Sequence, residues 1–153
     1  MDDKEKALMR EKIKEEAMSW LNTAYHHKEA VKGQGADCGL ILIKIYANLG
    51  FIDFNEVVRD IGNYSEDWAF HQDDFRYLKQ VLRFCDEIIT DKPLTGDIIL
   101  YRWGKVPSHG SLVLDYPTII HAFRPYNCVC LDTNERIFLR KKMTGIYRPK
   151  DLM

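Results

Sequence analysis

The sequence predicts an α+β fold in which N-terminal helices pack on a small antiparallel β-sheet. Three segments compatible with helices lie before residue 91, whereas short apolar runs separated by turn signals follow Pro93. Helices followed by strands are typical of α+β domains, in contrast to the alternating order of βαβ folds. A chain of 153 residues can bury one sizeable core, so we expect a single domain over residues 1–153.

Three helices are expected in the first part of the chain. Residues 3–22 have one apolar and one charged face, and residues 38–49 form an apolar run that Gly50 closes at the C-cap position. Residues 65–68 suit a short helical turn, and residues 74–90 carry a 3.6-residue stripe. The expected apolar positions are Leu8, Ile13, Ala17, Trp20 and Leu21 in the first helix, and Phe75, Leu78, Val81, Leu82, Cys85 and Ile89 in the last, with Asp73 or Asp74 as its cap.

An antiparallel meander is expected after Pro93. Gly and Pro turn signals separate the apolar runs at intervals that suit hairpins. The expected strands are residues 98–103, 109–114, 118–123, 128–131 and a short last strand at 146–148.

Composition excludes several classes of function. The formal net charge of −1 predicts neither a nucleic-acid-binding nor an anionic-membrane-binding surface. No apolar run approaches the roughly 18 residues that a membrane span needs. The N-terminus is charged throughout and lacks the apolar core of a signal peptide. We therefore expect synthesis in the cytoplasm, and delivery by another route if the protein acts elsewhere.

The four cysteines do not form paired CxxC motifs, so no structural zinc site is predicted, and no cofactor is expected. Cys128 and Cys130 would share one face of a strand, where a disulfide between such close neighbours is strained. We interpret Cys85, Cys128 and Cys130 as small apolar filler residues.

The segment from Gly33 to Gly50, GQGADCGLILIKIYANLG, suggests a reactive thiol. Asp37 is expected to cap the helix that follows, with Cys38 in its first turn. A thiol there lies near the positive end of the helix dipole, which favours thiolate and predicts a lowered pKa.

Two histidines could supply a base for Cys38. His109 begins one expected strand and His121 lies in the next, so a tight turn can bring both onto one face of the sheet. A cysteine nucleophile needs a base and a third group that orients the base, and the order Cys, His, polar residue is the papain-like one. Two alternatives remain open: half-buried structural histidines, and a metal site made of both histidines and a carboxylate, although no HxH or HExxH spacing supports a metal.

Four segments together resemble the NlpC/P60-type cell-wall cysteine peptidases, most closely their small phage-tail-associated subgroup. The segments span most of residues 18–149: TAYHHKEAVKGQGADCGL, YSEDWA, PLTGDIILYRWGKVPSHGSLVL, and YPTIIHAF with GIYRP. The resemblance implies a papain-like fold and hydrolysis of peptidoglycan stem peptides, typically at the γ-D-glutamyl to diaminopimelate bond. It also implies action at the cell wall or periplasm within a phage-like particle, with phage tail-hub proteins as partners.

The resemblance also implies roles for five residues. Cys38 would be the nucleophile, His109 the general base and His121 the orienting third member. Tyr25 matches a tyrosine near the nucleophile and substrate, and Asp37 matches an acidic position that meets the free amine of the substrate in some relatives. The backbone N–H of Cys38 would form part of the oxyanion hole, since an N–H at a helix start is an available donor.

One difference from the family pattern motivates an alternative function. Relatives have Asp-Cys-Ser-Gly-Leu or Asp-Cys-Leu-Gly-Leu, whereas Gly39 here follows Cys38 directly. A one-residue deletion rotates the following helix positions by about 100°. The alternative is therefore a structural tail-tip protein or plug that has kept the fold and lost activity. Transfer of an acyl group, or amidase action on another acyl group, is a third interpretation.

Overall fold

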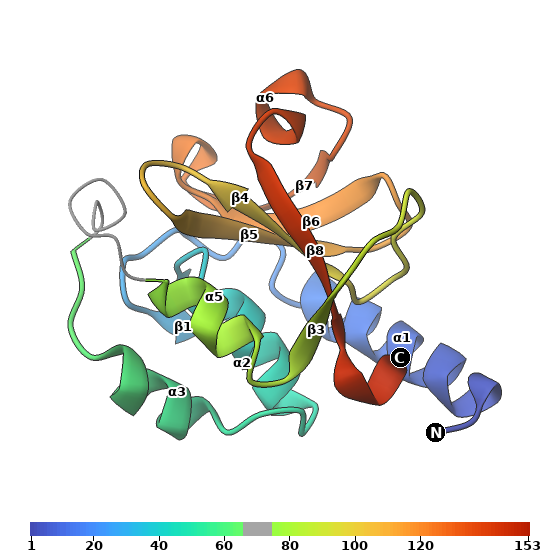
Figure 1. The fold of residues 1–153 in the computed structure, drawn as a ribbon. Helices are drawn as coiled ribbons and strands as arrows, with labels where there is room; N and C mark the ends of the chain where they lie inside the picture. The colour runs from blue at the N-terminus through green and yellow to red at the C-terminus, as the bar shows by residue number, and fades with distance from the viewer. Residues whose placement is uncertain (66–74) are drawn as a thin grey trace.

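A six-stranded antiparallel sheet with helices on both faces organises the chain (Figure 1). The computed structural model describes residues 1–65 and 75–153. The strands lie in the order β3-β8-β4-β5-β6-β7. Their bounds are β3 Cys85–Ile88, β4 Ile98–Arg102, β5 Pro107–Val113, β6 Thr118–Phe123, β7 Cys128–Thr133 and β8 Met143–Pro149. The predicted α+β class is confirmed.

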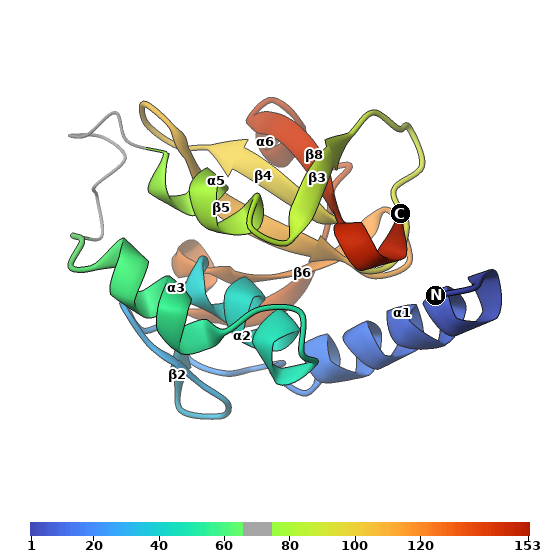
Figure 2. The same ribbon diagram turned by 60° about the horizontal axis from the view of Figure 1, so that its bottom comes forward.

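Helices cover the two faces of this sheet unequally, as Figures 1 and 2 show. Helices α1, α2 and α5 lie against one face with α3 beyond them, and the short α6 lies over the other. A separate two-stranded sheet pairs β1 with β2. The bounds are α1 Asp3–Met18, β1 Ala30–Val31, β2 Gly35–Ala36, α2 Leu40–Asn48, α3 Phe54–Ile61, α5 Arg76–Val81 and α6 Ile137–Arg140, with 3₁₀ turns at Arg124–Tyr126 and Lys150–Leu152.

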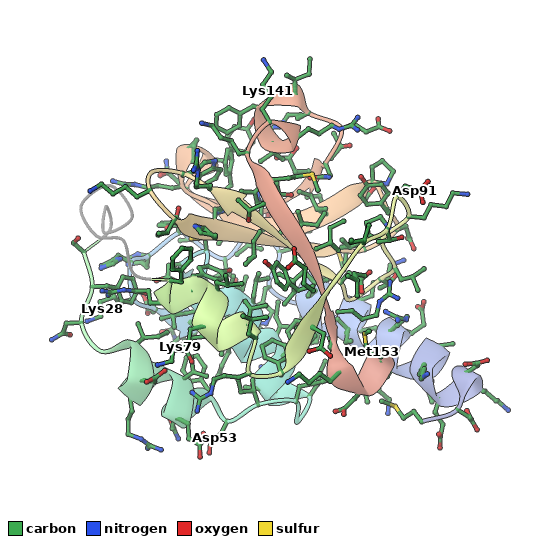
Figure 3. All side chains as sticks on the ribbon, in the orientation of Figure 1. Lys28, Asp53, Lys79, Asp91, Lys141 and Met153 are labelled. Carbon is green, nitrogen blue, oxygen red and sulfur yellow. The ribbon has the colours of Figure 1, made fainter. Side chains whose placement is uncertain are left out.

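Apolar side chains fill both sides of the sheet. The larger cluster packs α1 and α2 against the strands. Its members include Trp20, which follows α1, Leu42 of α2 and Leu112 of β5. A smaller cluster on the other face packs Leu139 of α6 against Tyr101 and its neighbours. In Figure 3 the side chains occupy the space between α2, α5 and the sheet, while Lys79 and Lys141 lie at the surface.

Local sequence accounts for the start of α1 and for the apolar composition of α2. Asp2 and Glu5 form a capping box at the start of α1, which satisfies two backbone N–H groups that have no partner within the helix. Helix α2 is apolar on most sides because it is buried on most sides, with six of its nine residues in the core. Helix α1 ends at Met18, before the expected residue 22, and Leu8 is exposed although we placed it on the buried face.

The predicted helix over residues 74–90 is wrong beyond Val81. The chain turns after α5 and Cys85–Ile88 forms an edge strand that pairs with Arg148 and its neighbours on β8. Pairing with a distant strand overrides the local helical pattern, and Ile89 is fully exposed. The expected turn at 65–68 and the caps Asp73 and Asp74 lie wholly or partly outside the described residues. Helices α3 and α6 and the β1–β2 pair were not predicted.

The predicted meander is confirmed for β4 to β7, which pair consecutively and antiparallel, and β6 has the predicted bounds. The last strand is longer than predicted and returns to lie between β3 and β4. Arg148 on β8 donates two hydrogen bonds, of 2.8 and 2.7 Å, to the fully buried carboxylate of Asp97. This bidentate pair ties the start of β4 to β8.

All four cysteines are free thiols. Cys85 is buried, as predicted for a filler residue, whereas Cys128 and Cys130 are half-buried. Among the described residues, no helix is long and apolar enough to cross a membrane.

Candidate active site

A cavity of about 280 Å³ lies beside the start of α2. Strands β5 and β6 pair next to their connecting turn, at Leu112↔Ile120 and Val113↔Ile119. The cavity lies toward the other end of the two strands, where Ser108 and His109 from β5 and Ala122 from β6 line it. Cys38, Asp37 and Tyr25 line the same cavity, so the structure brings four of the five predicted site residues together. His121, the fifth, does not line the cavity and is hydrogen-bonded to His109.

Asp37 caps α2, as predicted, although Cys38 lies just before the helix and not in its first turn. Helix α2 begins at Leu40. The Oδ1 atom of Asp37 accepts hydrogen bonds from the backbone N–H groups of Gly39 at 3.1 Å and Leu40 at 2.7 Å. These two donors are among the groups that a helix start leaves without intrahelical partners. The carboxylate therefore holds the backbone on either side of the thiol.

The second carboxylate oxygen of Asp37 is also occupied. Its Oδ2 atom accepts from the backbone N–H of Lys28 at 2.9 Å and from the hydroxyl of Tyr64. Asp37 is only 3% exposed, and burial raises its pKa, although hydrogen bonds from Tyr64, Leu40 and Lys28 act in the opposite direction. Each oxygen of the Asp37 carboxylate thus already accepts two hydrogen bonds from the protein. The geometry therefore supports the structural role of Asp37 more directly than the substrate role.

The thiol of Cys38 contacts the strand that carries His109. Its Sγ atom donates to the backbone carbonyl of Ser108 at 3.5 Å. The hydroxyl of Tyr77 on α5 donates to the carbonyl of Cys38 at 3.0 Å, and so fixes the backbone from the other side. Among the described residues, no backbone carbonyl accepts the N–H of Cys38, so this donor is available to a ligand.

The prediction of a lowered thiol pKa is contradicted. Burial, with a smaller contribution from the negative charge of Asp37, raises the pKa of Cys38 to about 12. A hydrogen bond with Tyr25 and the backbone N–H groups of Cys38 and Gly39 lower it by less. The helix start does favour the thiolate, but the cost of charging a sulfur surrounded by protein, beside a carboxylate, is larger. The resting group is therefore a neutral thiol.

His109 and His121 are buried and hydrogen-bonded to each other, as the sequence suggested. Nε2 of His109 lies 2.8 Å from Nδ1 of His121, and the two side chains are almost inaccessible to solvent. Burial lowers the pKa of His121 to about 4 and that of His109 well below its usual value. Both imidazoles are therefore neutral near pH 7. The Nδ1 atom of His109 is buried and has no hydrogen-bond partner among the described residues.

Two neighbours of this histidine pair were not predicted from the sequence. Trp103 stacks on the ring of His109 with centroids 4.0 Å apart. Asp132 on β7 contacts Nε2 of His121 at 3.0 Å, and Arg136 contacts the same carboxylate at 2.7 Å. The pairing of His121 with Cys130 places Asp132 two residues further on the same face of β7, a signal available from hairpin register.

The alternative of a metal site required both histidines and a carboxylate. Asp132 is a carboxylate close to His121, but His121 has no free ring nitrogen to bind a metal. Both ring nitrogens of His121 are engaged, one with His109 and the other with Asp132. Within the part of the chain that the structure describes, no group of three or more His, Cys, Asp or Glu side chains is arranged to hold a metal ion.

The fold and the site together define an α+β protein in which a cysteine and a buried histidine line one cavity, with a second buried histidine hydrogen-bonded to the first. Solved structures of the NlpC/P60 fold match this chain. A Staphylococcus aureus protein described as similar to lipoprotein, NLP/P60 family, superposes with a TM-score of 0.65 and 16% identity over 97% of this chain and 42% of its own. The peptidoglycan hydrolase RipB of Mycobacterium tuberculosis superposes with a TM-score of 0.63 and 15% identity, over 97% of this chain and 67% of its own.

The NlpC/p60 domain of the peptidoglycan hydrolase SagA gives a TM-score of 0.58 at 15% identity, over 90% of this chain and 96% of that domain. This chain thus spans nearly all of an isolated NlpC/P60 domain but less than half of the Staphylococcus protein. No family model matches the sequence, and neither does any curated protein. At these identities the likeness establishes the NlpC/P60 fold, which confirms the predicted one.

Proposed function

We propose that this protein is a cysteine endopeptidase that hydrolyses peptidoglycan stem peptides, with Cys38 as nucleophile, His109 as general base and His121 as the residue that orients His109. The observation that carries the proposal is the shared cavity. It holds the half-buried thiol of Cys38 and a buried histidine whose Nδ1 atom has no partner among the described residues. A nucleophile next to a base that a third group orients is the arrangement that acyl transfer requires.

The reaction follows from the protonation states of the free protein. The thiol and the imidazole are both neutral, so the proton moves from Sγ of Cys38 to Nδ1 of His109 as the sulfur attacks the carbonyl carbon. The backbone N–H of Cys38 donates to the oxygen that becomes negative. The imidazolium then returns its proton to the leaving amine, and a thioester remains. Water, deprotonated by His109, hydrolyses the thioester and restores the thiol.

The substrate class is proposed from the structural neighbours. SagA and RipB are described as peptidoglycan hydrolases, and a Bacteroides uniformis protein with a TM-score of 0.55 and 11% identity, over 90% of this chain and 96% of its own, as an N-acetylmuramoyl-L-alanine amidase. We take the γ-D-glutamyl to diaminopimelate bond as the expected site of cleavage. Association with a phage or prophage tail, with tail-hub proteins as partners, belongs to the same proposal.

Muropeptides of known structure test this function. Wild-type protein should produce two fragments whose masses sum to that of the substrate plus one water, and Cys38→Ala should produce none. Cys128→Ser is the matched control, because Cys128 is also half-buried but does not line the cavity. Equal cleavage by the wild type and Cys38→Ala would refute the proposal. Product masses that retain a transferred acyl group would indicate acyl transfer.

A structural tail-tip component that lacks activity is the second candidate. Two observations favour this second candidate: the residue that relatives carry between the cysteine and the glycine is missing between Cys38 and Gly39, and the pKa of the thiol is raised. It predicts no turnover of any wall fragment and stable binding to a tail-hub protein. Hydrolysis that depends on Cys38 would exclude it as the sole function.

A further inference from the structure

A chain of hydrogen bonds runs from His109 on β5 through His121 on β6 to Asp132 on β7, across neighbouring strands on one face of the sheet. His109 contacts His121 at 2.8 Å, His121 contacts Asp132 at 3.0 Å, and Arg136 contacts Asp132 at 2.7 Å. The side chain of His121 is inaccessible to solvent, and that of Asp132 is 9% exposed. Among the described residues, Asp132 is thus the protein's charged contact to the buried histidine pair.

We infer that Asp132, held in place by Arg136, is a positioning residue that fixes the tautomer of both histidines and leaves the Nδ1 atom of His109 as a free proton acceptor. An ionised carboxylate can only accept hydrogen bonds, so Nε2 of His121 must carry the proton in that contact. The Nδ1 atom of a neutral His121 is then an acceptor, and Nε2 of His109 must donate to it. The only lone pair left on His109 is at Nδ1.

This assignment agrees with an independent observation. Nδ1 of His109 is the ring nitrogen that lacks a partner among the described residues, and it is buried. A protonated Nδ1 would be a buried donor without an acceptor, which is unfavourable. A bare Nδ1 beside the cavity has a use if Cys38 is the nucleophile, because it can accept the proton of the thiol.

The surroundings of Asp132 hold the carboxylate in one orientation. The backbone N–H of Thr133 donates to its Oδ1 atom at 2.8 Å, while His121 and Arg136 share Oδ2. The guanidinium of Arg136 lies 5.2 Å from the ring centroid of Phe123, and Phe123 in turn stacks on His121. Arg136 and the backbone therefore keep an acceptor oxygen directed at His121.

Asp132→Asn is the sharpest test, because it changes one acceptor into a donor with little change in shape. The backbone N–H of Thr133 cannot move and favours the amide oxygen at the Oδ1 position, so the amide NH₂ group faces His121 and the guanidinium of Arg136, whose side chain is 33% exposed, turns away toward solvent. That NH₂ group donates to Nε2 of His121, and both tautomers invert along the chain. His109 then presents an Nδ1–H group to the cavity and cannot accept a proton. In serine proteases the corresponding change lowers kcat about 10⁴-fold with the geometry intact.

Long-range ¹H–¹⁵N spectra of histidine-labelled protein read the tautomers directly, with assignments from His109→Gln and His121→Gln. In the wild type both rings should carry the proton on Nε2, and in Asp132→Asn both should carry it on Nδ1. Glu135→Gln, an exposed substitution nearby, should leave both tautomers unchanged. An Nδ1–H group on His109 in the wild type would overturn the inference even if no variant folds. Nε2–H tautomers in a folded Asp132→Asn, Arg136→Met protein, in which Thr133 alone orients the amide, would also overturn it.

The catalytic part of this inference rests on the proposed function and has its own readout. On muropeptides, Asp132→Asn should lower kcat by about 10³-fold or more with little change in KM, since Asp132 does not line the cavity. Full kcat in Asp132→Asn would refute the positioning role while the proposed function stands. If the wild type cleaves no muropeptide but shows the expected tautomers, the proposed function fails and the tautomer assignment holds.

Discussion

The buried histidine pair should make the protein unusually sensitive to moderate acid. His121 is 1% exposed, and burial lowers its pKa to about 4, although the charge of Asp132 opposes this effect. The unfolded chain takes up a proton on this histidine near pH 6.5, whereas the folded protein does so only near pH 4. Between these values the unfolded state binds more protons, so stability is present above pH 6.5 and is lost as the pH falls toward 4.

The magnitude follows from the two pKa values. At pH 4 the unfolded histidine is almost fully protonated and the folded one about half, which lowers the free energy of unfolding by about 3 kcal/mol relative to pH 7. His109, whose pKa is also lowered by burial, acts in the same direction. A total stability of about 5–15 kcal/mol is common for a domain, so the loss from His121 alone is a substantial part.

Urea denaturation at pH 7, 5.5 and 4 measures this effect. The wild type should lose about 3 kcal/mol more than His121→Gln over that range, because the variant lacks the titrating group. Cys128→Ser, a half-buried substitution on the neighbouring strand, should keep the pH dependence of the wild type. If the wild type and His121→Gln lose the same stability between pH 7 and pH 4, the buried neutral histidine is not the cause and the reasoning fails.

Three further predictions concern the thiol, a buried ion pair and the packing around the shortened segment. Burial raises the pKa of Cys38 to about 12. Its reaction with a small disulfide reagent at pH 7 should therefore be about 30-fold slower than that of an ordinary thiol. A reaction as fast as that of an ordinary thiol would contradict this prediction. Asp97→Asn should cost about 3–5 kcal/mol in denaturant unfolding, whereas the exposed Asp115→Asn should cost less than about 1 kcal/mol, and equal costs would refute the importance of burial. Gly39→Ala places a Cβ atom 3.0 Å from the ring of Tyr77 and should lower the free energy of unfolding by about 1–3 kcal/mol. In a double-mutant cycle, Tyr77→Leu should remove most of that cost. If the effects of the two substitutions simply add, the contact is not the cause.

The sequence contained most of the information needed to find Asp132. The predicted strands 118–123 and 128–131 are separated by four residues, and a hairpin of that length gives a register in which His121 opposes Cys130, as observed. Since strand side chains alternate, Asp132 then shares a face with His121. Our expected strand ended at residue 131, two positions before the observed end at Thr133, because aspartate does not favour a strand. The contact with His121 and Arg136 supplies the stabilisation that local propensity lacks.

The helix predicted over residues 74–90 failed for a different reason. Its apolar stripe fits a helix, and the residues up to Val81 do form one. From Cys85 the chain instead pairs with β8, a strand more than 50 positions away, and no local pattern specifies such a partner. The raised pKa of Cys38 was equally inaccessible: the helix start is visible in the sequence, but the burial of the sulfur and the orientation of Asp37 are properties of the folded site.

Burial of the thiol and the tautomer of the histidines are linked by the charge state of the pair. In a thiolate–imidazolium pair both ring nitrogens of the base carry protons, and the resting tautomer has no consequence. Here burial keeps both partners neutral, so the base has one proton and one lone pair, and only one of its two tautomers can accept the proton of Cys38. A site of this kind needs a fixed acceptor at the end of the hydrogen-bond chain. Asp132 supplies it, which is why we expect its charge, and not merely its shape, to decide whether His109 can act as a base.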